Sequence, residues 1–166
     1  ESSEASDVYK RQTIGGNGKT PLVKYIANEL IKLGYKPGIV SRGYGGKFKE
    51  TLRVTNETPV KQTGDEAQIL STLNIPFYID KNRVRALKTL NDNHDCDVII
   101  SDDGLQHYNM NRDVEIVVID GKRRFGNNLS FPAGPLRESL KRLDSVDFIV
   151  NNSGPTEDGE HLMNVS

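Results

Sequence analysis

The stretch TIGGNGKTP, residues 13–21, indicates which fold to expect of this chain. Its glycines let successive backbone N–H groups turn inward around phosphate oxygens, and the helical pattern that follows adds the positive end of a helix dipole. We therefore predict a phosphate-binding loop in which Lys19 reaches the β- and γ-phosphates and the Thr20 hydroxyl binds magnesium. One position departs from the usual pattern G-x-x-x-x-G-K-[ST], because Thr13 stands where that pattern has glycine. The predicted nucleotide-binding residues are Thr13, Gly15, Gly16, Asn17, Gly18, Lys19 and Thr20.

Composition favours a globular chain with a real core and no nucleic-acid partner. The chain has 166 residues, a formal net charge of -1 and 27% charged residues, so neither a strongly basic field nor an acidic disordered tail is present. One cysteine excludes an internal disulfide, and no His or second Cys lies at metal-ligand spacing from it. We predict that Cys96 is a buried core thiol. No apolar run approaches the ~18 residues of a membrane span.

Helical and strand patterns alternate along the chain. Helical periodicity covers residues 21–34, 65–74 and 82–93, and apolar strand patterns cover 36–43, 75–80, 97–101, 114–120 and 146–152. This alternation, with nearly continuous apolar strands, predicts an α/β fold with a mostly parallel sheet flanked by helices, as in P-loop NTPases. In the first helix, Gly34 is expected just beyond the C-terminus, and one face, which includes Ile31 and Leu33, is expected to pack on the sheet.

A second half-site is predicted in DVIISDDGLQH, residues 97–107, where an apolar strand ends in two carboxylates. Asp102 and Asp103 would lie at the edge where open parallel sheets bind ligands, and would hold magnesium. The alternative is a plain strand-terminating turn. The G-K-T loop makes that alternative the weaker one.

Three further polar clusters have two readings each. Ser41, Arg42 and Tyr44 follow a strand and would point into the same cleft, but a solvated loop explains them equally well. The same holds for Arg137 and Glu138 after a Pro-Gly-Pro turn. The last cluster, Asp65 and Glu66, opens a helix and is either a cap with favourable first-turn charge or, at Asp65, a general base. His107 either binds substrate or packs beside the strand end.

Six blocks in this order carry a family resemblance: IGGNGKTP, SRGYGGK, GDEAQIL, DDGLQH, DVEIVVIDGKRRFGN and PAGPLRE. They resemble the tetraacyldisaccharide 4'-kinase family, the lipid A 4'-kinases, from about Thr13 to Val150. Members of that family carry T-x-G-G-x-G-K-T, which accounts for Thr13. The resemblance implies transfer of the γ-phosphoryl group of ATP, with Mg²⁺, to the 4'-hydroxyl of an acylated glucosamine disaccharide 1-phosphate. This is a late step of lipid A and lipopolysaccharide biosynthesis in Gram-negative bacteria.

The resemblance also implies roles for individual residues. Lys19 and Thr20 match the phosphate and magnesium positions, and Asp65 matches the catalytic base. The implied catalytic residues are Asp65, Lys19, Asp102 and Asp103, and the implied metal ligands are Thr20, Asp102 and Asp103. The implied substrate-binding residues are Arg42, Tyr44, His107, Arg137 and Glu138. The full-length family is expected peripherally at the cytoplasmic face of the inner membrane.

Both ends of the chain depart from the family pattern. Residues 1–12 stand where the family has an apolar strand preceded by a membrane-associating segment, and we interpret them as a non-native N-terminus. Residues 13–150 are interpreted as the kinase core without its first strand, and 151–166 as the start of a linker to an absent C-terminal domain. We thus expect a soluble and incomplete kinase chain.

Three other functions remain open from the sequence. A deviant-loop ATPase switch would need a lysine directly before the glycine pair, where this chain has Ile14. A P-loop kinase of a soluble sugar or nucleoside would act without lipid or detergent. A non-catalytic nucleotide-binding module would bind ATP and transfer nothing.

Overall fold

A computed structural model describes residues 18–102, 111–120 and 140–164 of the chain. The chain divides into two compact units, one made of residues 1–19 and 112–166 and the other of residues 20–111. Each unit contains its own β-sheet.

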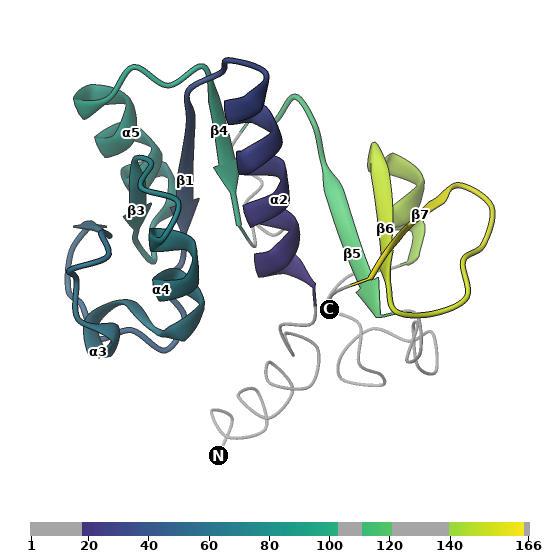
Figure 1. The fold of residues 1–166 in the computed structure, drawn as a ribbon, viewed down its shortest axis with the longest axis horizontal. Coiled ribbons are helices and arrows are strands. Elements are labelled where there is room, and N and C mark those ends of the chain that lie inside the picture. Colours follow the sequence, from purple (N-terminus) through teal and green to yellow (C-terminus); the bar gives the residue numbers. More distant parts are fainter. Residues whose placement is uncertain (1–17, 103–110, 121–139, 165–166) are drawn as a thin grey trace. The chain divides into compact units, whose positions relative to one another are not determined.

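The unit of residues 20–111 is built on a four-stranded sheet in the order β2-β3-β1-β4 (Figure 1). Its strands are β1 (Pro37–Ser41), β2 (Leu52–Arg53), β3 (Phe77–Ile79) and β4 (Val98–Ser101). β1 is buried along its whole length and pairs in parallel with β3 on one side and with β4 on the other. β2 pairs antiparallel with β3 and had no signal in the sequence, because two residues are too few to show a period.

Helices cover both faces of this sheet. They are α2 (Lys19–Lys32), α3 (Val60–Thr63), α4 (Asp65–Ser71) and α5 (Arg83–Asn93). One face buries Ile39 and Phe77 together with side chains of α2 and α4. The opposite face buries Val40 and Tyr78 against Ala86 and Leu90 of α5. The predicted α/β class, with a mostly parallel sheet flanked by helices, is therefore confirmed.

The C-terminus of α2 agrees with the sequence in its backbone and differs in its side chains. Gly34 adopts φ +89°, and the Tyr35 amide donates to the Leu30 carbonyl at 3.0 Å, as expected where a left-handed glycine ends a helix. The predicted apolar face was too wide, because Ile31 is 42% exposed and Leu33 is 73% exposed. Leu33 lies beyond the last helical residue, so the helical period no longer turns it toward the sheet.

Cys96 also corrects an expectation. It is partly buried, where a fully buried thiol was predicted, and it packs against the α5 side of the sheet. Burial, together with the neighbouring carboxylates of Asp95 and Asp97, raises the pKa of this thiol. The thiol therefore stays protonated at neutral pH and acts as an apolar packing group.

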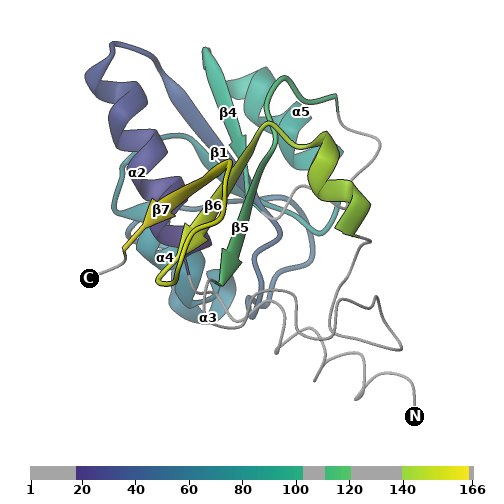
Figure 2. The ribbon, with the colours of Figure 1, turned by 90° about the vertical axis from the view of Figure 1, so that its right-hand side faces the viewer.

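The other unit contains a parallel sheet in the order β5-β6-β7 (Figure 2). Its strands are β5 (Ile116–Asp120), β6 (Phe148–Asn152) and β7 (Glu160–Met163), and a 3-10 helix covers Leu140–Ser145. β7 was not anticipated, because EHLM has no alternating apolar pattern. The side-chain amide of the buried Asn151 holds the connection between β6 and β7, because it donates to the Pro155 carbonyl at 2.8 Å and to the Glu160 carboxylate at 2.9 Å. Among the described residues, no helix has the length and apolar character needed to cross a bilayer.

Candidate functional site

The carboxyl ends of β1, β3 and β4 lie at one edge of the four-stranded sheet, because the three strands are parallel. Asp102 directly follows β4 and is 7% exposed, and its amide donates to the Val40 carbonyl at 3.0 Å. The Ser41 hydroxyl, at the end of β1, donates to Asp102 Oδ2 at 3.4 Å. This is the edge at which open α/β sheets bind ligands. Asp102 thus lies at the carboxyl end of a parallel strand, as the sequence led us to expect.

The described part of the phosphate-loop motif begins at Gly18, which has φ +114°. A Cβ atom at Gly18 would lie 3.0 Å from both the Asn152 amide nitrogen and the Met163 methyl group, so a side chain there would strain the backbone and push these two neighbours aside. Lys19 is the first residue of α2, and Thr20, which follows it, is only 5% exposed. Sequence reasoning missed Asn152, which had no motif around it.

The loop that follows β1 is held by its main chain. A Cβ atom at Gly64 would lie 2.1 Å from the Tyr44 carbonyl oxygen, and one at Gly46 would lie 2.3 Å from the Gln62 carbonyl oxygen. We call this close approach of two backbone segments the glycine contact. The side chains around it remain exposed: Arg42 is exposed, and Tyr44 is 48% exposed. The main chain at Tyr44 is thus fixed beside the start of α4, and Arg42 precedes it in the same loop.

Asp65 is the first residue of α4, and the glycine contact brings this helix start against the loop after β1. The N-cap residue is Gly64, with φ +84° and ψ 163°, and it makes no side-chain capping bond. The Asp65 side chain is exposed, and in the described part of the chain no hydrogen bond or ion pair to it is found. Asp65 is therefore not the cap of α4, although it and Glu66 do place acidic side chains in the first turn of the helix, as the same interpretation expected. Its carboxylate retains the freedom to accept a proton from a bound group.

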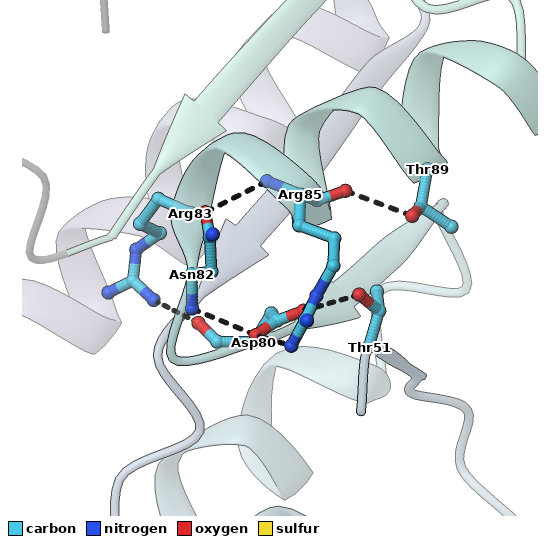
Figure 3. Close-up of polar contacts among 6 residues, drawn as sticks. All are labelled: Thr51, Asp80, Asn82, Arg83, Arg85 and Thr89. Atoms are coloured by element: carbon cyan, nitrogen blue, oxygen red, sulfur yellow. Dashed lines mark hydrogen bonds and ion pairs between the residues drawn. The ribbon is translucent and has the colours of Figure 1, made fainter. Parts of the chain in front are cut away.

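A polar cluster at the end of β3 was not recognised in the sequence (Figure 3). The buried Asp80 carboxylate accepts from Arg85 Nε at 2.6 Å and Arg85 Nη2 at 2.9 Å, from the Asn82 amide at 2.8 Å, and from the Thr51 hydroxyl. Burial opposes ionisation of Asp80, but these hydrogen bonds outweigh it and lower its pKa. A signal existed in the spacing of DKNRVR, where an Asp two residues before an N-cap Asn predicts a turn.

Several predicted site residues lie outside the described residues: Thr13, Gly15, Gly16, Asn17, Asp103, His107, Arg137 and Glu138. Within the described ranges, no group of three or more His, Cys, Asp or Glu side chains is arranged to hold a metal ion. The oxygen atoms of Thr20 and Asp102 nevertheless suit Mg²⁺, which takes few protein ligands beside water and substrate phosphates.

Comparison with known proteins gives a consistent result. The family model described as tetraacyldisaccharide-1-P 4'-kinase matches residues 11–165. The chain belongs to this kinase family. A tetraacyldisaccharide 4'-kinase of Shewanella frigidimarina is 51% identical over 152 residues, which cover 91% of this chain and 45% of that protein. One of Psychromonas ingrahamii is 52% identical over 144 residues, covering 86% of this chain and 45% of that protein.

A solved structure supports the same assignment. The crystal structure of LpxK from Aquifex aeolicus in complex with ATP matches with a TM-score of 0.75 and 29% identity, covering 91% of this chain and 50% of that one. The chain thus spans about half the length of the family members it matches. The resemblance found in the sequence is confirmed, and family membership weighs against the ATPase-switch alternative.

Proposed function

We propose that this chain forms the nucleotide-binding half of an ATP-dependent 4'-kinase that phosphorylates an acylated glucosamine disaccharide 1-phosphate in lipid A biosynthesis. The observation that carries the proposal is the family match over residues 11–165, which includes the G-K-T motif at the start of α2 and the strand-end Asp102. In the complete protein, we propose, this half works at the cytoplasmic face of the inner membrane.

On the nucleotide side, Lys19 and the loop Thr13–Thr20 would bind the β- and γ-phosphates of ATP. Thr20, Asp102 and Asp103 would hold Mg²⁺, which when bound neutralises charge that develops on the phosphate oxygens. The arrangement of Ser41 supports this role, because its hydroxyl donates to Asp102 Oδ2 and orients the carboxylate at the sheet edge. A ligand carboxylate that is itself hydrogen-bonded keeps one geometry.

On the acceptor side, Asp65 would accept the proton of the 4'-hydroxyl group as that oxygen attacks phosphorus. Arg42 and Tyr44 would bind the acceptor from the neighbouring loop, and His107, Arg137 and Glu138 would complete the substrate site. The exposure of Arg42, Tyr44 and Asp65 supports this reading, because the glycine contact holds the two segments that carry them through the main chain. A loose phosphoryl-transfer transition state needs little from the base, so an ordinary aspartate suffices.

A hybrid protein tests the proposal. This chain would replace the 152 matching residues of the Shewanella frigidimarina kinase, and transfer of ³²P from ATP to the tetraacyldisaccharide 1-phosphate would be followed in detergent. We expect transfer by the hybrid and its loss in Lys19→Ala, while Lys24→Ala, an exposed lysine on the same helix, leaves it unchanged. Lipid-independent ATP hydrolysis, or full activity in Lys19→Ala, would overturn the proposal.

A further inference from the structure

Arg83 is a buried arginine that joins two strand ends. It is the first residue of α5 and is 1% exposed. Its Nη1 donates to the Asp80 carbonyl oxygen at 3.0 Å, and its Nη2 donates to the Asp102 carbonyl oxygen at 3.0 Å. The two acceptors follow β3 and β4, which flank β1 on opposite sides. One guanidinium group therefore ties together the ends of the two strands that flank β1, at the edge of the sheet that carries the candidate site.

We propose that Arg83 is a positioning residue that fixes the main chain at Asp102, and so sets where the Asp102 carboxylate meets Mg²⁺·ATP. This inference rests on the proposed function of the site. Arg83 acts on the backbone of Asp102 from one side, while Ser41 acts on its carboxylate from the other. The planar guanidinium fork places two separated donors rigidly on two carbonyl oxygens, which the single ammonium group of a lysine does not do.

Burial of the charge supports a functional reason for this arginine. A cation is costly to bury, and each hydrogen bond that the guanidinium donates offsets part of that cost. A permanent positive charge at the carboxyl edge of the sheet attracts the phosphate oxygens of a nucleotide. The same group thus orders the Asp102 backbone and adds positive potential at the edge where the anion would bind.

Arg85 provides a matched control two residues along the same helix. It also bonds a residue at the end of β3, but it contacts the Asp80 carboxylate and its side chain is 53% exposed. Among the described residues at the end of β4, none is hydrogen-bonded to Arg85, which holds the turn after β3. A substitution that alters folding in general would act at both positions, whereas one that alters the metal site would act at Arg83.

The experiment is a calorimetric titration of ATP into this chain with Mg²⁺ and again with EDTA. The dissociation constant with EDTA divided by the one with Mg²⁺ measures how much the metal contributes to ATP binding. We expect Arg83→Lys to lower this ratio about 10-fold, as substitutions of groups that orient metal ligands do. Arg85→Lys should leave the ratio unchanged within about twofold. An unchanged ratio in a folded Arg83→Lys variant would overturn the inference.

A second measurement needs no variant. In ¹⁵N NMR spectra of the wild-type chain bound to ATP, the Arg83 guanidinium signal should shift when Mg²⁺ is added, and the Arg85 signal should stay in place. No shift at Arg83 would overturn the inference about Arg83 and leave the proposed function standing. Failure of the wild-type chain to bind ATP both with and without Mg²⁺ would instead overturn the proposed function, and the inference with it.

Discussion

Two segments that follow parallel strands at the same edge of the sheet are held in opposite ways. The turn after β3 is held by side chains, because the Asp80 carboxylate is bound by Arg85, Thr51 and the Asn82 amide. The loop after β1 is held by its main chain at the glycine contact. As a result the first segment buries its carboxylate, whereas the second exposes Arg42 and Tyr44, and Asp65 at the start of α4, across the glycine contact, is exposed too.

The difference shows how a binding loop can be rigid and still present reactive side chains. A carboxylate that already accepts four hydrogen bonds has its lone pairs engaged, so Asp80 cannot take a further proton or ligand cheaply. Close packing of two backbone segments fixes positions without using any side chain. Rigid placement of groups that remain exposed is what a transfer reaction needs from its acceptor site.

The largest expected effect comes from breaking the glycine contact. Gly64→Ala puts a methyl group 2.1 Å from the Tyr44 carbonyl oxygen and forces a side chain into a backbone region that only glycine occupies easily. We expect the free energy of unfolding to fall by about 3 kcal/mol or more.

Gly34→Ala is the matched control for that variant. Gly34 has a similar φ, +89°, but a Cβ atom there would meet nothing within 4 Å. Backbone strain alone should cost about 1 kcal/mol. Urea unfolding of both variants gives the comparison, and equal losses would show that the glycine contact adds nothing beyond strain.

The next effect comes from the side-chain network. Asp80→Asn keeps the shape of the side chain but removes the charge that Arg85 and Thr51 bind, so we expect a loss of about 2 kcal/mol in the free energy of unfolding. Asp92→Asn, an exposed aspartate on α5, is the control and should change stability by less than about 0.5 kcal/mol. Equal stabilities of the two variants would mean that the charge of Asp80 adds nothing to the free energy of unfolding.

These two segments also show what the sequence could and could not predict. Apolar periodicity was enough for the three longer helices α2, α4 and α5 and for the parallel strands other than β7, since burial follows it directly, whereas the four-residue α3 and β7 carry no such period. Asp102 was found because a carboxylate after an apolar strand is a local pattern. The turn around Asp80 left a local signal in DKNRVR, but its bond to Thr51 and the bond of Arg83 to the Asp102 carbonyl join residues distant in sequence and had none. The glycine contact likewise joins residues about twenty apart, and no local pattern reports such an approach.

Acid should remove the contribution of Asp80. Its pKa is lowered in the folded chain, so folding gains stability from the ionised carboxylate above its unfolded pKa of about 3.9 and loses it as the pH falls through the lower folded value. We expect the stability difference between wild type and Asp80→Asn to be constant from pH 7 to pH 5 and to shrink below about pH 4. Urea unfolding across this range checks it, and a difference that persists at pH 2 would contradict the charge-based account.

The smallest expected change in stability is at Asp65. Its carboxylate is exposed and, in the described part of the chain, makes no hydrogen bond, so Asp65→Asn should alter the free energy of unfolding by less than about 0.5 kcal/mol. In the hybrid kinase the same change should lower turnover by about 100-fold or more while ATP affinity stays the same, because a general base acts on the acceptor and not on the nucleotide. A stability loss would make Asp65 structural like Asp80, and a collapse of ATP affinity would make it a nucleotide or metal ligand. A variant that is stable, binds ATP and transfers phosphate slowly fits a site in which main-chain contacts hold the segments in place and the exposed side chains act in the reaction.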